Sequence, residues 1–309
     1  MFELRRLRLL RELALRGTLA SVAEALSYSP STVSQQLSLL EKEAGVTLFV
    51  PDGRRVRLTA SGQSLAAHAE RMLALNEEAR AELESLQALA APVRVAVMQT
   101  AAQSLLPTAL TIVAEHEPQL RVEAAEVPPE EALFELAARG YDIVVAEQYP
   151  GHARQLGAQL VRQSLGDDPI RLALPPESAA QTLSDLHNVP WVLEPRGTAA
   201  RRWSVQQCRA AGFEPDVRFE VADLTTQVRL IAAGRAVGLL PDLVWNDSAR
   251  TVRLLDLPGN PTREIFTTQR SSSVARNSIR TVLQALQQAF TQRQQAVDTG
   301  ATSTTHPWS

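Results

Sequence analysis

A row of small hydrogen-bonding side chains recurs at helical spacing between residues 31 and 38. At about 100° per residue these polar groups share one face, whereas Val33, Leu37 and Leu40 fall on the opposite face. In a DNA major groove, glutamine can form two hydrogen bonds to adenine, and serine or threonine can reach a base or a phosphate. The candidate base-reading residues are Ser31, Thr32, Ser34, Gln35, Gln36 and Ser38.

Three arginines follow the turn-forming run Pro51-Asp52-Gly53. The apolar residues on both sides of this turn predict a short β-hairpin, which would place the arginines near its tip. Guanidinium groups bind phosphate through paired hydrogen bonds. Arg54, Arg55 and Arg57 are therefore the candidate phosphate contacts.

Sequence signals for three helices show which elements would position the polar residues 31–38. Leucines at helical spacing predict a first helix over residues 4–14, Thr18 can cap a second helix, and Ser29 can cap a third with Pro30 at its first position. With the hairpin, these signals predict a winged helix-turn-helix over residues 1–60. The alternative is a three-helix packing unit whose polar face is only solvated.

Residues 61–90 lack proline and contain one glycine, Gly62, which predicts a long helix. Apolar residues repeat every seven positions, with further seam positions four residues later, as in a coiled coil. This linker would dimerise, and the alternative is that it packs on its own chain. The seam residues are Leu65, Met72, Asn76, Ala79, Leu83 and Leu86.

Short apolar runs alternate with helical patterns from residue 91 to residue 291, which predicts an α/β domain. In open α/β sheets, ligands bind at the carboxyl ends of strands, and helix N-termini offer free N–H groups to anions. For Asp223, a simple N-cap is the favoured alternative. The candidate ligand-binding residues at strand ends are Gln99, Thr100, Glu126, Glu194, Gly197, Thr198 and Asp223.

The charges near these strand ends bear on the class of ligand. Glu126, Glu147 and Glu194 would suit a cationic or amino-containing ligand, and Arg196 would suit a carboxylate. Together they favour an amino acid or a small carboxylate. Solvated acids explain the three glutamates equally well.

Composition excludes several classes of protein. The 309 residues are 45% hydrophobic and 21% charged, contain one cysteine, and hold no apolar run of the ~18 residues that a membrane span needs. The start resembles no signal peptide, so we expect a cytoplasmic protein with no membrane contact. The net charge is -3, but residues 1–60 carry nine positive and six negative side chains. This excludes a protein that binds DNA through bulk charge alone.

Enzyme signatures are missing from the sequence. There is no glycine-rich phosphate loop, the five histidines are scattered, and Cys208 has no histidine within ten residues. We therefore predict no catalytic residues, no metal and no cofactor. The rival interpretation is a two-lobed α/β enzyme or small-molecule binding protein with an N-terminal docking module.

Residues 4–10, 17–26, 29–40, 45–49 and 57–62 resemble the LysR-type transcriptional regulator family. The resemblance covers the whole chain and implies a two-lobed effector domain similar to periplasmic binding proteins. Lobe I would hold about 91–161 and 267–291, and lobe II about 162–266. The chain would pass between the lobes at hinges near 161–164 and 264–268. Residues 292–309 are expected to be disordered. One departure is Pro30, because many members carry glutamine there, so operator preference does not carry over.

The resemblance also implies function. The protein would be a sequence-specific transcriptional regulator whose operator binding responds to a small-molecule effector. Its partners would be double-stranded operator DNA, a second copy or three further copies of the chain, and RNA polymerase if it activates. An effector that favours one arrangement of the lobes would shift the spacing of the winged domains on DNA.

Overall fold

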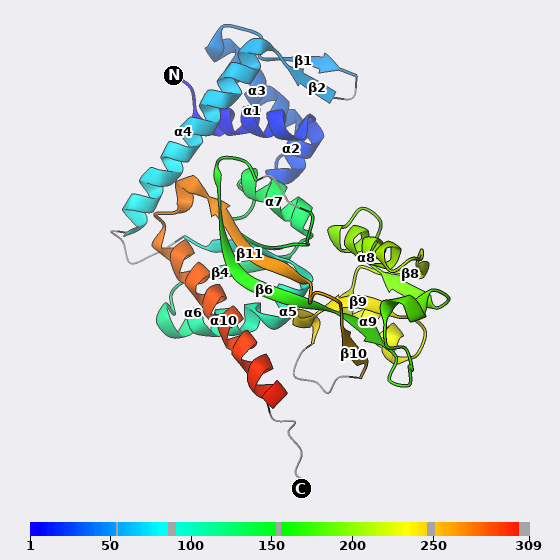
Figure 1. The fold of residues 1–309 in the computed structure, drawn as a ribbon. Helices are drawn as coiled ribbons and strands as arrows, with labels where there is room; N and C mark the ends of the chain where they lie inside the picture. The colour runs from blue at the N-terminus through cyan, green and yellow to red at the C-terminus, as the bar shows by residue number, and fades with distance from the viewer. Residues whose placement is uncertain (54, 86–90, 153–155, 246–250, 303–309) are drawn as a thin grey trace.

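The computed structural model describes residues 1–53, 55–85, 91–152, 156–245 and 251–302, and Figure 1 shows its three successive parts. A small N-terminal domain is joined by one long helix to a two-lobed α/β domain. Among the described residues, no helix is both long enough and apolar enough to cross a membrane.

The N-terminal domain is a winged helix-turn-helix, and local capping sets its helix boundaries. The Thr18 hydroxyl accepts a hydrogen bond from the Ser21 backbone, and the Ser29 hydroxyl accepts one from the Thr32 backbone. Leucines from the first and third helices pack in one buried cluster. The elements are α1 (Leu4–Arg16), α2 (Leu19–Ala25), α3 (Pro30–Ala44), β1 (Phe49–Asp52) and β2 (Arg55–Leu58).

The linker is helix α4 (Ala60–Ser85), and one side of it packs on its own chain. Ala66 and Ala69 are buried against the core of the winged domain. Gly62 lies so close to that domain that a Cβ there would be 1.9 Å from the Leu48 carbonyl oxygen. Close helix contact therefore fixes the direction in which α4 leaves the winged domain.

Lobe I is built on the parallel strands β4-β3-β5, followed by two antiparallel strands, β11 and β6. Helices α6 and α10 cover one face of this sheet, and α7 covers the other. The strands are β3 (Val93–Val97), β4 (Val122–Glu126), β5 (Ile143–Gln148), β6 (Leu160–Leu174) and β11 (Thr262–Arg270). The helices are α5 (Gln99–Ser104), α6 (Leu106–His116), α7 (Pro129–Ala137), η3 (Ser271–Ser273) and α10 (Asn277–Thr302).

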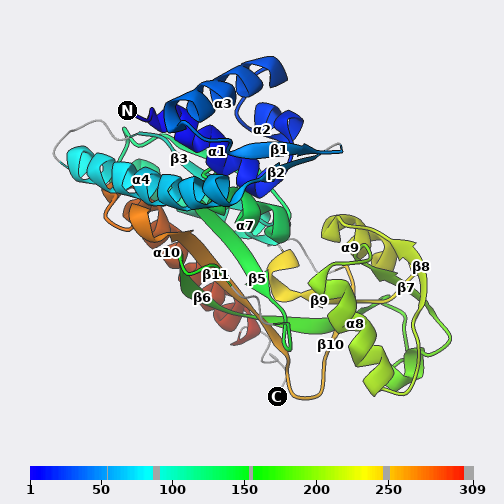
Figure 2. The same cartoon turned by 90° about the horizontal axis from the view of Figure 1, so that it is seen from above.

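Lobe II uses the second half of β6, which pairs with β9 and β10 on its two edges. Figure 2 shows this lobe beside lobe I, connected through the long strands β6 and β11. A separate parallel pair, β7 and β8, also belongs to this lobe, and one α-helix follows each of these strands in the chain. The elements are η1 (Leu183–Leu186), β7 (Pro190–Leu193), α8 (Ala199–Ala210), β8 (Asp216–Glu220), α9 (Leu224–Ala232), β9 (Gly238–Pro241), η2 (Asp242–Val244) and β10 (Arg253–Asp256).

The passage between the lobes lies further along the strands than the expected hinges. Residues 161–164 and 264–268 pair within the lobe I sheet, and β6 takes its first lobe II partner at Ile170, opposite Pro241. Gly166, at the β-bulge, has φ +149° and leaves space for the Phe290 ring. Because β6 and β11 stay paired beyond the expected hinges, the chain passes between the lobes at about residues 166–170 and 262–263.

The chain end also differs from expectation. Helix α10 continues to Thr302, so residues 292–302 are helical rather than disordered. The segment contains three glutamines and two alanines, which are good helix formers, and Ala289 and Phe290, just before it, are buried in the lobe I core. Residues 303–309 lie outside the described part of the chain.

Candidate functional site

Helix α3 presents the predicted polar row to solvent. Ser31, Gln35 and Ser38 are exposed, Thr32 and Ser34 are half-buried, and the apolar residues of the opposite face are completely buried. The side chain of Gln35 has no hydrogen-bond partner within the described residues. Its amide is therefore free to pair with a base edge.

Three other members of the row already make contacts within the protein. The Gln36 carbonyl oxygen accepts a hydrogen bond of 3.1 Å from the Arg6 Nε. The hydroxyls of Ser31 and Thr32 each lie 2.8 Å from the Ser29 hydroxyl, which caps the helix. Gln36 thus helps to fix α3 on α1, and this lowers its availability to DNA relative to Gln35.

The hairpin supplies positive charge beside α3. Arg55 and Arg57 are both exposed on β2, and Lys42 is exposed in the last turn of α3. None of the three has an acidic partner among the described residues. Arg54, the third predicted phosphate contact, lies outside those residues.

The exposed face of α4 matches the expected seam in part. Met72 and Leu83 are 40% and 58% exposed, Ala79 is exposed, and Leu65 and Asn76 are half-buried. Leu75, which the heptad pattern did not include, is 66% exposed next to this row. Leu86 lies outside the described residues. The seam is an unpartnered apolar stripe in the single chain.

A buried arginine lies where the two lobes meet. Arg263 on β11 is 1% exposed, and its Nε donates to the Asp168 carboxylate on β6 at 2.9 Å. Its Nη2 donates to the Thr100 hydroxyl at 2.8 Å, and its Nη1 pairs with Glu147. Burial opposes the charge, but Glu147 and Asp168 raise the pKa of Arg263.

Glu194 brings another acid from lobe II to this cluster. Burial raises the pKa of Glu194, and the negative charge of Glu147 raises it further, to about 7. Arg263 and the Thr198 hydroxyl only partly oppose these effects. The cluster therefore contains three acids, Glu147, Asp168 and Glu194, for one guanidinium group, and Tyr149 packs beside it.

Gln99 joins the two lobes across the cleft. Its amide nitrogen donates to the Asp223 carboxylate at 2.7 Å, and its carbonyl oxygen accepts from the Leu224 backbone at 3.0 Å. Asp223 also caps α9 by accepting from the Thr225 backbone at 2.8 Å. The N-cap interpretation of Asp223 is therefore confirmed, and the same carboxylate contacts lobe I.

The remaining predicted effector residues are placed differently. Thr198 caps α8 by accepting from the Arg201 backbone, and Gly197 precedes it with φ +96°. Glu126 is exposed at the end of β4 and makes no described contact with the acidic cluster. The side chain of Arg196 is 87% exposed, so it is not a carboxylate ligand inside the cleft.

Sequence reasoning missed Arg263 and Asp168. A signal exists for Arg263, because it is a charged residue at the start of a largely buried strand, but Asp168 lies between two exposed residues and gives none. A charge in such a position needs a charged partner nearby. The pairing itself depends on the register of β6 against β11, which no local pattern reveals.

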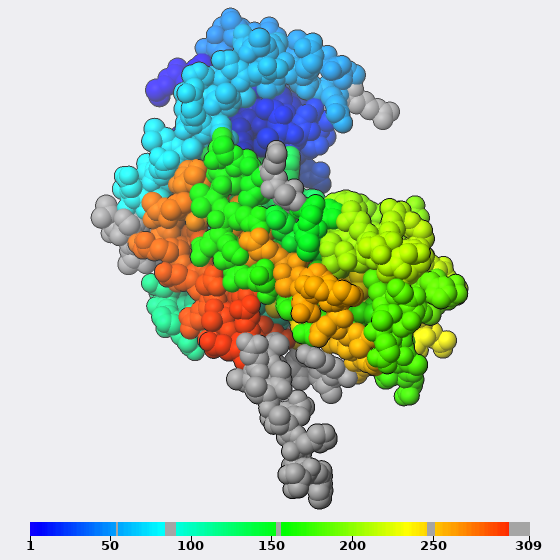
Figure 3. Space-filling view, in the orientation of Figure 1, coloured from blue at the N-terminus to red at the C-terminus, as the bar shows by residue number. Residues whose placement is uncertain are grey.

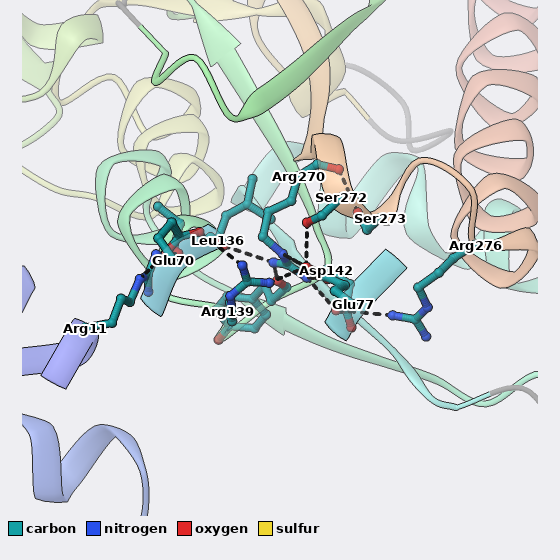
Figure 4. Close-up of polar contacts among 12 residues, drawn as sticks. Arg11, Glu70, Glu77, Leu136, Arg139, Asp142, Arg270, Ser272, Ser273 and Arg276 are labelled. Carbon is teal, nitrogen blue, oxygen red and sulfur yellow. Dashed lines mark hydrogen bonds and ion pairs between the residues drawn. The ribbon is translucent and has the colours of Figure 1, made fainter. Parts of the chain in front are cut away.

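A second polar cluster connects α4 to lobe I, as Figure 4 shows. The Glu77 carboxylate accepts from Arg270 Nε at 3.0 Å and from the Ser272 hydroxyl at 2.7 Å, and it pairs with Arg139. Burial would raise the pKa of Glu77, but the Arg270 guanidinium lowers it, to about 2. This carboxylate is therefore ionised at neutral pH.

The winged domain contacts lobe I directly, and the two are in contact in Figure 3. The two Nη atoms of Arg16 on α1 donate to the Glu135 carboxylate on α7 at 2.8 Å each. Arg11 reaches the Ala137 carbonyl and also bonds to Glu70 on α4. The winged domain, the linker and lobe I are thus joined by one connected polar network.

Comparisons with known proteins agree with this architecture. Residues 4–63 match the model of the bacterial regulatory helix-turn-helix proteins of the lysR family, and residues 87–291 match that of the LysR substrate binding domain. The transcriptional dual regulator GltC of Bacillus subtilis is 28% identical over 249 residues, which are 80% of this chain and 83% of GltC.

Two further proteins are similar along most of their length. A probable hydrogen peroxide-inducible genes activator of Streptomyces viridosporus is 31% identical and covers 75% of this chain and 76% of its own. A full-length OxyR variant from Pseudomonas aeruginosa superposes with a TM-score of 0.65 at 22% identity, covering 93% of this chain and 95% of its own. With a winged helix-turn-helix, a linker helix and a two-lobed ligand domain in this order, the chain belongs to the LysR family of transcriptional regulators.

Proposed function

We propose that this regulator reads its operator mainly through Gln35, while Arg55 and Arg57 bind the flanking phosphates. The observation that supports this is the free amide of Gln35 at the centre of an exposed polar face, next to cations without acidic partners. Two copies joined through the exposed stripe of α4 would present two such helices to a palindromic site. Contact with RNA polymerase belongs to this proposal only if the regulator activates. Its place of action is the cytoplasm, where operator DNA is found.

Selection of bound duplexes from a random library, with the full-length protein, tests this function. We expect enrichment of a palindrome whose half-sites are about one helical turn or a multiple of it apart. Recovery of unrelated duplexes at equal affinity would contradict sequence-specific reading.

We infer that the cleft binds a small effector that carries a protonated amine. Arg263 is already neutralised by Glu147 and Asp168, so it is not a free ligand for a carboxylate. Glu194 is the uncompensated acid of the cluster, and a cation beside it would relieve the repulsion from Glu147. An amino acid satisfies this requirement through its ammonium group.

The effector would act by changing how the lobes meet. Gln99, Thr100, Glu194 and Asp223 come from both lobes, so a ligand among them binds one lobe arrangement better than another. A thermal-shift screen of amino acids, diamines and plain carboxylates tests the ligand class. Stabilisation only by carboxylates that lack an amine would contradict it.

The peroxide response named for the Streptomyces relative is not part of this proposal. Cys208, the single cysteine, is fully buried in the lobe II core, and burial raises its pKa to about 12. A thiol rather than a thiolate is therefore present at neutral pH, and thiols react slowly with oxidants.

A further inference from the structure

A groove of about 930 Å³ lies between the winged domain, α4 and lobe I. Its walls come from the start of α1, the turn before α3, one side of α4 and the loops of lobe I near Asp142 and Arg270. Asn76 and Leu83 of the predicted seam are among the α4 residues, so the groove opens beside the stripe proposed for dimerisation. It is separate from the cleft around Arg263. Its volume is typical of a small-molecule site.

The groove has an excess of positive charge. Seven arginines line it, compared with three acids, Glu77, Glu123 and Asp142. Glu77 and Asp142 are already shared among the arginines of lobe I, and Glu123 pairs with Arg121 outside the groove. The acids of the groove therefore leave part of its positive charge without a counterion.

Arg8 is the clearest case of an uncompensated cation. Its Nε is buried and has no hydrogen-bond partner in the part of the chain that the structure describes, and no acid there forms an ion pair with it. Burial lowers the pKa of Arg8, and the positive charges of Arg94 and Arg139 lower it further, although Glu12 partly opposes this. A buried donor without an acceptor costs free energy that a bound anion would recover.

Two other arginines of the groove, Arg5 and Arg80, also lack an acidic partner among the described residues. Arg80 on α4 is exposed and has no ion-pair partner within the described residues. Arg5 stacks its guanidinium 4.9 Å from the centre of the Tyr28 ring and leaves its N–H groups for another acceptor. Arg5 and Arg8 come from the winged domain and Arg80 comes from the linker, so their charges converge from two parts of the chain.

We propose that this groove is a second ligand site, which binds a small anion with at least two negative charges on phosphate or carboxylate groups. Planar guanidinium groups bind both kinds of group through paired hydrogen bonds. Operator DNA is a different occupant, and it is a separate outcome of the test.

Binding here would couple directly to DNA recognition. The ligand touches α1 and the turn that leads into α3 on one side, and lobe I on the other. It would therefore stabilise the arrangement in which the winged domain is packed against lobe I, and so change operator affinity. The anion in this groove and the effector between the lobes would bind at different sites. Both would change the equilibrium between arrangements of the winged domain that differ in operator affinity.

Pyrophosphate and citrate are suitable probes, titrated into the full-length protein at constant ionic strength and followed by calorimetry and thermal shift. We expect saturable binding of at least one probe, and the stronger probe shows whether phosphate or carboxylate is preferred. Arg8→Gln and, separately, Arg80→Gln should weaken binding at least tenfold. Arg218→Gln, which removes the same charge from the exposed face of β8, should leave it unchanged.

Three results would overturn the proposal. One is the absence of saturable binding by either probe at millimolar concentration, and another is equal weakening by Arg218→Gln. The third is a pair of groove variants that bind both probes normally but lose affinity for DNA of any sequence, since the arginines would then belong to the DNA interface. Arg80 is exposed, so its variant remains informative if Arg8→Gln does not fold.

Discussion

Arg263 and Asp168 face each other across β11 and β6, at the point where both strands pass from one lobe to the other. They are 1% and 2% exposed, and they form a buried ion pair with an N–O distance of 2.8 Å. A buried pair of this kind is costly to break, because either partner alone would be an uncompensated charge. The two strands that connect the lobes therefore carry a buried polar anchor.

Base reading by Gln35 predicts a selective effect of mutation. Gln35→Ala should lower affinity for the operator by about 1–3 kcal/mol and leave binding to unrelated DNA nearly unchanged. A gel-shift titration with specific and scrambled duplexes measures both values. Gln206→Ala, at an exposed position on α8, is the matched control. Unchanged operator affinity in the Gln35 variant would disprove this role.

The hairpin arginines should act on all sequences alike. Arg55→Ala or Arg57→Ala removes one phosphate contact, so specific and non-specific binding should weaken together. The slope of the logarithm of affinity against the logarithm of salt concentration should fall by about one for each arginine. Loss of operator binding alone, with an unaltered salt slope, would instead indicate a base contact. Arg54→Ala is predicted to behave in the same way.

Glu194 should make effector binding depend on pH. Its pKa is about 7 in the folded protein, and a protonated amine binds better to the ionised carboxylate. Affinity for such a ligand should therefore rise as pH increases from 6 to 8 and level off above the pKa. Glu194→Gln should weaken binding and remove this pH dependence, as calorimetry at several pH values would show. A stronger interaction at pH 6 than at pH 8 would contradict an amine ligand.

The apolar stripe on α4 predicts dimerisation. Met72→Glu places a charge within the stripe and should shift the protein towards monomer in light scattering at micromolar concentration. Ala67→Glu introduces the same charge on an exposed position of α4 away from the stripe and should have no effect. If both variants retain the oligomeric state of the wild type, the stripe is not the interface.

Glu77 should stabilise the packing of α4 on lobe I at neutral pH. Its pKa is lowered to about 2 in the folded protein from an ordinary value of 4.5, so its contribution is complete above pH 4.5 and disappears as pH falls towards 2. Glu77→Gln should lower the free energy of unfolding by about 2–3 kcal/mol at pH 7. Urea titrations should show the difference from wild type shrinking at pH 3. A difference independent of pH would indicate a packing effect instead.

Much of the winged domain follows from local rules. Thr18 and Ser29 cap their helices through hydrogen bonds to residues three positions later, and the two faces of α3 follow from a single helical period. Such interactions depend only on near neighbours in the chain. The α4 stripe is predicted less completely. Ala69, seven residues before the seam residue Asn76, packs on the winged domain, whereas Leu75, which the heptad pattern leaves out, is exposed.

By itself, the sequence determined the order of the elements, the polar face of α3, and the strand ends from which a cleft would be built. The tertiary structure alone decided which charged side chains have a partner of opposite charge and which do not. Arg263 is neutralised by acids that lie 95 and 116 positions away in the chain, and Gln99 meets Asp223 only when the lobes approach. Strand register and domain packing create these contacts, and they determine both the acidic cleft and the basic groove at the domain junction.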